Sequence, residues 1–194
     1  MNVDNNVAMR LLHFSDLHGA AMRQAEQLIK RVDPDWIILT GDILPDFRRF
    51  PSESARLQAQ RTWWTEWRAV FQSDACPTTF IRGNHELEGF HDRSLRSVPP
   101  ELSGRVGFIE GIPACWGAYG FPREMGDREL AHEAASAGGS LVILSHVPPY
   151  GLLDLTRHGD HIGHIPMLEL IDPPEESSLS RHNDPPVLVL CGHV

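Results

Sequence analysis

The sequence has few cysteines and no long apolar run. Its three cysteines, Cys76, Cys115 and Cys191, are odd in number and form no CxxC pair. This argues against a disulfide framework and a zinc ribbon, and it favours a reducing compartment. No stretch approaches the roughly 18 apolar residues that a membrane span requires, and residues 1–10 lack the apolar core of a signal peptide. We therefore expect a cytoplasmic protein with no membrane partner.

Positive charge is also scarce. Lys and Arg number 17 against 26 Asp and Glu, which gives a formal net charge of −9. Long nucleic acid is held mainly by basic side chains on its phosphates, so this balance argues against it as a partner. Bound divalent cations would add positive charge where an anion binds, so the negative net charge does not exclude a small phosphate ester as the substrate.

The length and composition are those of one globular domain, and the order of its apolar segments indicates the α/β class. Of 194 residues, 41% are hydrophobic and 22% are charged, which is enough to bury a core, and we predict a single domain over residues 1–194. Short apolar runs alternate with longer segments of helical spacing. The runs predict strands at Arg10–Phe14, Trp36–Leu39, Thr78–Ile81, Leu141–Leu144 and Val187–Leu190, with weaker ones at Val106–Ile109 and Cys115–Tyr119.

Helical spacing of apolar residues predicts four helices between these strands. They cover Ala21–Val32, Ser52–Gln72, Asp127–Ala137 and Met167–Ile171. The second carries Trp63, Trp64 and Trp67 on one stripe, which could stack nucleobases but at this spacing favours core packing. The segments Leu87–Gly104 and Val147–Pro166 show neither pattern and are predicted to be functional loops or lids.

A polar cluster directly follows each of the five main predicted strands. The clusters are Ser15-Asp16-Leu17-His18, Thr40-Gly41-Asp42, Arg82-Gly83-Asn84-His85-Glu86, Ser145-His146 and Cys191-Gly192-His193. Ligand sites in open α/β sheets lie outside the carboxyl ends of the strands, so we expect these clusters to converge. Imidazole nitrogens combined with carboxylate and amide oxygens, without thiolate, suit Mn²⁺, Fe or Zn²⁺.

Two bridged cations at such a site would favour phosphate ester hydrolysis. The carboxylate of Asp42 can give one oxygen to each of two ions, and an ion pair of this kind activates water and holds the oxygens of an in-line displacement. Each cluster alone is a weak signal, because a Gly-Asp pair is more often a turn and a buried histidine such as His146 is more often structural. The ordered set DxH, GD, GNHE, SH and GH is the specific signal.

This ordered set resembles the calcineurin-like metallophosphoesterase superfamily, whose pattern is DxH, GDxx, GNH[DE], H and GHxH. The resemblance runs from Asp16 to His193. It implies a four-layer α-β-β-α sandwich and a metal-dependent phosphoesterase with two divalent cations, Mn²⁺ before Fe or Zn²⁺. Residues 145–170 also look like the corresponding loop of a small MPPED-like branch, which fits a phosphodiesterase acting on a small phosphate ester.

The resemblance assigns metal ligands residue by residue. The ligands would be Asp16 and His18 for the first ion, Asp42 as the bridge, and Asn84, His146 and His193 for the second. His85 would not bind metal but would serve as general acid or stabilise transition-state charge beside the leaving group. Asp46 is a candidate partner for its ring, although it could equally be a solvated loop residue. Glu86 is interpreted as a hydrogen-bond acceptor for the backbone.

Substrate contacts are expected from Arg82 and from the loop after His146. This loop contains the sequence HGDHIGH at 158–164, whose glycines break helical spacing, so we interpret it as overhanging the active site instead of forming its own metal site. Asp160 or His161 would then touch the substrate, and Arg82 would contact its phosphate, although a salt bridge is the commoner role of such an arginine. Cys191 is expected to pack as a small apolar residue.

The pattern departs from the family at its end. The chain stops at Val194, before the second histidine of GHxH, and the first ion would then have Asp16, His18, Asp42 and water, with partial occupancy. The family's later strands are also missing, which fits either a truncated chain or a protein whose open sheet edge pairs with a partner. The alternative function is a non-catalytic metal-binding or phosphate-binding scaffold.

Overall fold

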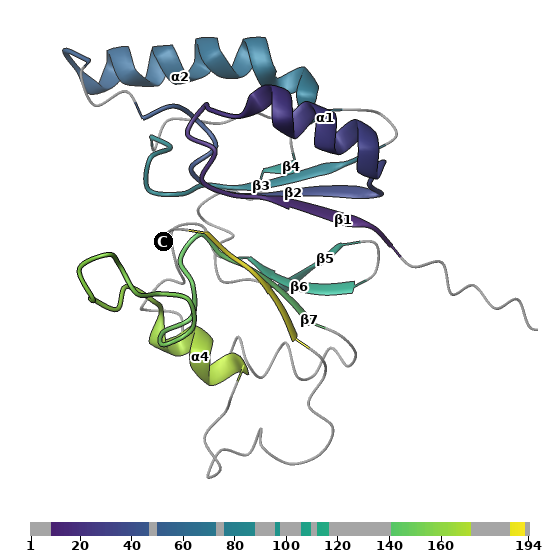
Figure 1. Ribbon diagram of the computed structural model, residues 1–194, viewed down its shortest axis with the longest axis vertical. Coiled ribbons are helices and arrows are strands. Elements are labelled where there is room, and N and C mark those ends of the chain that lie inside the picture. The colour runs from purple at the N-terminus through teal and green to yellow at the C-terminus, as the bar shows by residue number, and fades with distance from the viewer. Residues whose placement is uncertain are drawn as a thin grey trace, which may run out of the picture.

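The computed structural model describes residues 9–46, 50–72, 76–87, 96–97, 106–109, 112–116, 141–171 and 187–192. Within these ranges the chain forms two four-stranded sheets that lie face to face (Figure 1). Helices α1 and α2 lie over the outer side of the first sheet, and α4 lies on the opposite side of the molecule, next to the second sheet. The predicted α/β class and α-β-β-α sandwich are therefore confirmed.

The first sheet is entirely parallel. Its strands are, in order, β1 (Leu11–Phe14), β2 (Trp36–Thr40), β3 (Thr78–Ile81) and β4 (Arg96–Ser97). Parallel neighbours need crossover connections. These include α1 (Met22–Val32) between β1 and β2, and α2 (Glu53–Trp67), which leads through the 3₁₀ helix Arg68–Val70 to β3. Ser52 caps α2, since its hydroxyl accepts a hydrogen bond from the Ala55 amide at 3.2 Å.

The second sheet is mixed. Its strands are, in order, β5 (Val106–Ile109), β6 (Ile112–Trp116), β7 (Leu141–Leu144) and β8 (Val187–Leu190). The pair β5 and β6 is antiparallel, whereas β6, β7 and β8 run parallel. Helix α4 (Ile165–Ile171) lies between β7 and β8 in the sequence. No helix in the described ranges is long and apolar enough to cross a bilayer.

Alternate residues of β2 face different layers of the sandwich. Ile37 and Leu39 join the cluster that includes α1 and α2, while Trp36 and Ile38 join Val142 and Leu144 of β7 between the two sheets. Side chains alternate along a strand, so one strand contributes to two cores. All five residues of β2 are buried, as is typical of a strand covered on both faces.

The tryptophans of α2 pack in the core, as predicted. Trp64 is buried, and its ring centroid lies 6.1 Å from that of Phe71 and 6.1 Å from that of Phe80. Trp63 and Trp67 are partly buried against the same cluster. The stripe therefore fixes α2 on the sheet.

Three predicted elements need comment. The strand predicted at Cys115–Tyr119 is β6, which begins at Ile112 and includes Pro113, a residue that sequence patterns place outside strands. The segment Leu87–Gly104, predicted to be irregular, contains β4, whose two residues are too few to give a periodicity. The predicted helix Asp127–Ala137 lies outside the described residues.

Candidate metal centre

The loops that follow the parallel strands meet at one edge of the sandwich. The amide of Asp16 donates to the carbonyl of Gly41 at 3.1 Å, and the amide of His18 donates to the carbonyl of Asp42 at 2.8 Å, so the loop after β1 is bonded to the loop after β2. In the second sheet, the amide of Gly192 donates to the carbonyl of His146 at 3.0 Å. Polar clusters far apart in the sequence are thus brought together.

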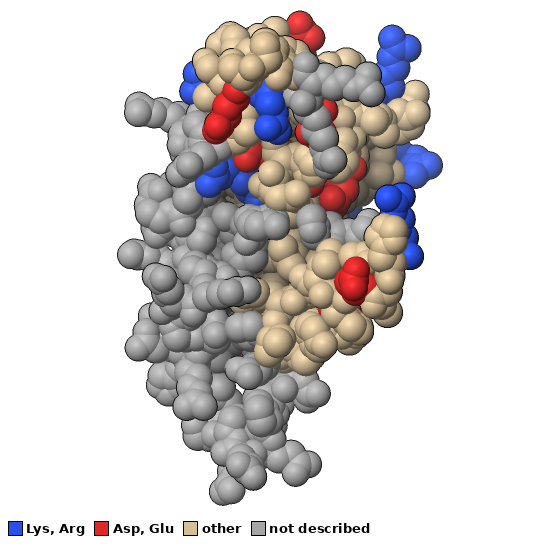
Figure 2. Space-filling model, turned by 90° about the vertical axis from the view of Figure 1, so that its left-hand side faces the viewer, with Lys and Arg blue, Asp and Glu red and all other residues tan. Residues whose placement is uncertain are grey.

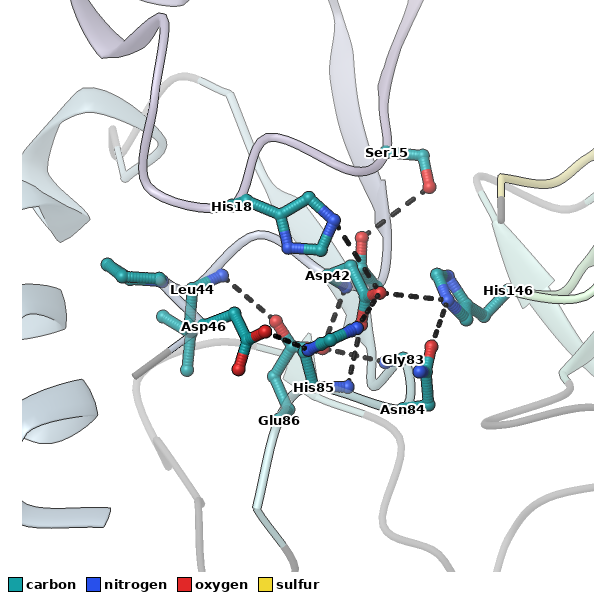
Figure 3. Close-up of polar contacts among 12 residues, drawn as sticks. Ser15, His18, Asp42, Leu44, Asp46, Gly83, Asn84, His85, Glu86 and His146 are labelled. Atoms are coloured by element: carbon teal, nitrogen blue, oxygen red, sulfur yellow. Dashed lines mark hydrogen bonds and ion pairs between the residues drawn. The ribbon is translucent and has the colours of Figure 1, made fainter. Parts of the chain in front are cut away.

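Asp42 occupies the centre of this meeting point (Figure 3). Its Oδ2 lies 3.8 Å from His18 Nε2, 3.7 Å from His85 Nε2 and 3.3 Å from His146 Nε2. Its Oδ1 accepts a hydrogen bond of 2.8 Å from the His85 amide. Burial alone would raise the pKa of Asp42, but hydrogen bonds and charge from His146 and His85 outweigh it and lower the pKa. The side chain is therefore a buried carboxylate facing three imidazoles.

Two groups of possible metal ligands share Asp42. One consists of Asp16, Asp42 and His146, and the other of His18, Asp42 and His85; within each, the donor atoms all lie within 4.8 Å of one another. The amide oxygen of Asn84 lies 3.0 Å from His146 Nε2 and so adjoins the first group. This set of nitrogen and oxygen donors without thiolate fits a borderline divalent cation.

The grouping differs from the assignment that the resemblance implies. Among the described residues, the donor atoms of Asp16 are grouped with His146, not with His18. His85, assigned no metal, has its Nε2 3.7 Å from Asp42, against 3.8 Å for His18. The imidazole rings of His18 and His85 also meet edge to face, with centroids 4.9 Å apart. His193, the remaining assigned ligand, lies outside the described residues.

His146 is oriented as a metal ligand needs to be. Its Nδ1 lies 2.8 Å from the carbonyl oxygen of Thr40, which can only accept, so Nδ1 carries the proton. The neutral ring then presents an unprotonated Nε2 toward Asp42 and Asn84. Burial opposes charge on this ring, but the hydrogen bond and charge of Asp42 outweigh burial and raise the pKa of His146. A cation bound at Nε2 would take the place of the second proton, which the ring carries there when it is charged.

The loops approach one another closely and turn sharply. Asp16, His18 and Asp42 have φ values of 55°, 47° and 53°, in the left-handed region. At Gly83, a Cβ atom would collide with the Asp42 carboxylate, and at Gly192 it would collide with the side chains of Ser15 and Asp16. Glycine is therefore required at both places, because any side chain would push the loops apart.

Glu86 joins the loops after β2 and β3 through the backbone, as interpreted from the sequence. Its Oε2 accepts hydrogen bonds from the amides of Asp42 and Gly83, both at 2.7 Å, and its Oε1 accepts one from the amide of Leu44 at 3.0 Å. Burial raises the pKa of Glu86, against the effect of these donors. The side chain contacts backbone and supports the site from behind.

The ring of His85 is held from its other side by Asp46. His85 Nδ1 lies 3.3 Å from Asp46 Oδ2, the partner named as a candidate from the sequence. Arg56 of α2 lies 3.8 Å from the second oxygen of Asp46. Gln60, also in α2, donates to the His85 carbonyl at 2.7 Å and was missed in the sequence. Its only signal is its spacing of four residues from Trp64, on the buried side of the helix.

Arg82 contacts its own loop. Its Nη1 donates to the carbonyl of Leu87 at 3.4 Å, and its buried Nε finds no hydrogen-bond partner among the residues that the structure describes. Cys191 is half-buried, and burial raises the pKa of its thiol, in keeping with an apolar packing role.

The loop after His146 is ordered by a buried carboxylate. Asp154 accepts hydrogen bonds from His161 Nδ1 at 2.8 Å and from the Gly163 amide at 3.1 Å, and the His161 ring lies beside Tyr150, with centroids 5.0 Å apart. The described contacts of His161 are thus within the loop. Among the described residues, no candidate metal group includes the histidines of HGDHIGH.

Figure 2 shows the face of the molecule on which this loop lies. Basic and acidic side chains gather there over the half that carries α1 and α2. The loop presents Leu152, Leu153 and Leu155 to solvent, and Leu153 is 85% exposed.

Comparison with known proteins agrees with this geometry. The family model described as calcineurin-like phosphoesterase matches residues 9–194. The chain belongs to this family. Membership indicates a metal-dependent phosphoesterase, and the two donor groups around Asp42 supply candidate ligands for the metal. No curated protein matches the sequence of this calcineurin-like phosphoesterase significantly.

Solved structures share its fold at low sequence identity. One crystal structure is 14% identical, covers 96% of this chain and 84% of its own, and has a TM-score of 0.63. The crystal structure of TT1561 of Thermus thermophilus is 15% identical, covers 84% of this chain and 77% of its own, and has a TM-score of 0.51. Likeness at these identities establishes the fold alone.

Proposed function

We propose that this calcineurin-like phosphoesterase is a phosphodiesterase that hydrolyses a small phosphate ester with two divalent cations, Mn²⁺ in the first instance. The observation that carries the proposal is the buried carboxylate of Asp42, which belongs to both groups of candidate ligands. A carboxylate shared in this way can give one oxygen to each of two ions. The likeness of residues 145–170 to the MPPED-like branch supports a phosphodiester as the substrate.

The proposed ligands are those that the family resemblance assigns. Asp16 and His18 would hold the first ion, Asp42 would bridge, and Asn84, His146 and His193 would hold the second. When bound, such cations lower the pKa of a water molecule and neutralise phosphate oxygens. Asp42 is ionised in the ordinary pH range because its pKa is lowered, so it needs no deprotonation before it binds.

His85 is proposed to act on the leaving group. With Nδ1 facing Asp46 at 3.3 Å, the ring can hold a second proton at Nε2, on the side of the site where Asp42 lies. As a water oxygen bonds to phosphorus and the bond from phosphorus to the ester oxygen breaks, the ester oxygen would take the proton from Nε2 and leave as the alcohol. Arg82 and His161 are proposed to contact the substrate.

Hydrolysis of bis-p-nitrophenyl phosphate by the purified chain tests the proposal. We expect turnover that rises with added Mn²⁺ and stops with EDTA. His85→Ala should lower turnover by about 10²- to 10⁴-fold while Mn²⁺ binding, measured by calorimetry, stays within about threefold. Asp42→Asn should lose both turnover and Mn²⁺ binding, because a carboxamide cannot bridge two cations.

The exposed Asp33→Asn is the matched control for charge and should behave as the parent. Turnover retained in His85→Ala would refute the role of His85, and two ions bound normally by Asp42→Asn would refute the ligand assignment. Phosphate binding by the parent without any hydrolysis would instead establish a binding scaffold.

A further inference from the structure

Helix α2 turns two polar side chains toward the site loops. Arg56 and Gln60 are four residues apart, and Trp64 follows four residues later, so all three share one face of the helix. Gln60 is completely buried, and the side chain of Arg56 is 27% exposed. Neither residue belongs to the family motifs, and a buried glutamine on an aromatic stripe needs a reason beyond packing.

Gln60 links the loop after β2 to the loop after β3. Its Nε2 donates to the carbonyl of His85 at 2.7 Å and reaches the carbonyl of Pro45 at 3.5 Å, while its Oε1 accepts from the amide of Leu87 at 3.2 Å. A primary amide can donate and accept at once, which few side chains do. One helical residue thereby bonds to the backbone of the loop after β2 at Pro45 and to that of the loop after β3 at His85 and Leu87.

Arg56 reaches the ring of the same histidine through Asp46. Its Nη2 lies 3.8 Å from Asp46 Oδ1, and Asp46 Oδ2 lies 3.3 Å from His85 Nδ1. Both side chains of this ion pair are mostly buried, with exposed fractions of 27% and 19%. The arginine therefore places its positive charge beside the oxygen of Asp46 that does not face the ring.

We propose that Arg56 and Gln60 are positioning residues that set the orientation of the His85 ring toward Asp42, Gln60 through the His85 carbonyl and Arg56 through Asp46. The catalytic consequence rests on the proposed function, whereas the ring orientation does not. A catalytic group displaced by about 1 Å can cost on the order of 100-fold in rate, so two such contacts have a measurable effect.

The orientation is tested first in the metal-free, ¹⁵N-labelled chain. Imidazole nitrogen signals of His85, identified by their loss in His85→Asn, are compared in the parent, Gln60→Met and Arg56→Met. We expect both variants to shift the Nδ1 signal of His85 and to leave that of His146 in place. Arg56→Lys, which keeps the charge, should restore the signal in part. Gln58→Met and Arg61→Met alter exposed residues of the same helix and should change nothing.

The kinetic test uses bis-p-nitrophenyl phosphate with saturating Mn²⁺. Gln60→Met and Arg56→Met should lower kcat by about 10- to 100-fold, with KM and Mn²⁺ affinity within about threefold of the parent. In the His85→Ala background the same substitutions should lower the residual rate no further, because their effect passes through His85. A general structural role would predict an equal loss in both backgrounds.

The two tests fail independently. Unchanged His85 nitrogen signals in the folded variants would overturn the positioning role, even in an active enzyme. A parent without hydrolytic activity would refute the proposed function, and the nitrogen signals would still decide the positioning role. Thermal unfolding monitors the fold, and if Gln60→Met does not fold, Arg56→Met decides on the same signal.

Discussion

The motif residues around Asp42 adopt an uncommon backbone conformation. Asp16, His18 and Asp42 all have positive φ, which Asp and His tolerate better than β-branched residues do, at a free-energy cost that surrounding contacts must offset. These left-handed residues lie within four residues of the ends of β1 and β2, so they bend the chain close to the sheet edge. A motif such as DxH therefore specifies backbone shape as well as donor atoms.

A single carboxylate also gives the loop after His146 a pH-dependent stability. Burial would raise the pKa of Asp154, but hydrogen bonds from the Gly151 amide, His161 and the Gly163 amide outweigh it and lower the pKa. Because folding lowers this pKa, ionised Asp154 stabilises the fold above its unfolded value of about 4, and the contribution is lost as the pH falls through the lower folded value.

Asp154→Asn should therefore lower the Tm by several degrees at neutral pH. The difference between variant and parent should disappear as the pH falls well below about 4, where the parent is protonated too. Thermal unfolding across a pH series measures it, with exposed Asp160→Asn as the control. A difference that persists unchanged at a pH of about 2 would show that shape, not charge, is responsible.

At the scale of elements, Glu86 connects the loop after β2 to the loop after β3. Its carboxyl group accepts hydrogen bonds from three backbone amides, those of Asp42, Leu44 and Gly83. In Glu86→Gln one of the two oxygens becomes an NH₂ group. This group is a donor, so it cannot accept a hydrogen bond from the backbone amides that it faces. A buried donor left unsatisfied costs about 1–3 kcal/mol.

Urea unfolding should show a loss of free energy in this range for Glu86→Gln, and the exposed Glu66→Gln on α2 should show almost none. Because the affected loops carry Asp42 and Asn84, Mn²⁺ affinity should fall as well. Unchanged stability would mean that the loops are held by other contacts.

Elements buried on both faces are the ones that the sequence predicts well. Strands β2 and β3 are short runs of apolar and β-branched residues, all of them buried, and the tryptophan stripe identifies the buried side of α2. The two-residue β4 and the proline-containing β6 have no such pattern, because their pairing depends on neighbours that the chain supplies elsewhere. Hydrophobic periodicity predicts strands that are buried, but it does not predict strands that form only because a neighbouring strand pairs with them.

The candidate site shows the same division. The convergence of the polar clusters was predictable, because each cluster directly follows an apolar run and parallel strands end at the same edge. The grouping of donor atoms around Asp42 was not, since it depends on the local turns of the loops. Gln60 was also missed, because its partners are backbone atoms of Pro45, His85 and Leu87, which no residue pattern records.

At the scale of the whole molecule, the packing of the two sheets determines the site. Asp42 comes from the first sheet and His146 from the second, yet their side chains lie 3.3 Å apart. Ile38, fully buried, lies in the cluster between the sheets with Val142 and Leu144. Contacts in this layer therefore hold the two halves of the site in register.

Ile38→Ala should cost about 2–5 kcal/mol of unfolding free energy, because it removes buried methyl groups and leaves a cavity between rigid sheets. Ile165→Ala, at a position 55% exposed, is the matched control and should change stability little. Urea unfolding followed by tryptophan fluorescence measures both. Equal costs for the two substitutions would mean that the inter-sheet layer is loosely packed.

A cation held by both sheets should in turn stabilise the whole fold. A ligand that binds only the folded state adds about 2.7 kcal/mol at about 100 times its Kd, and for a domain of this size each kcal/mol raises Tm by roughly 2–4 °C. Saturating Mn²⁺ should thus raise the Tm of the parent by about 5–10 °C, and EDTA should reverse the shift. Asp42→Asn should show no shift, because its carboxamide cannot hold the cation between the loops after β2 and β7. A full Mn²⁺ shift in that variant would place the cation elsewhere in the molecule.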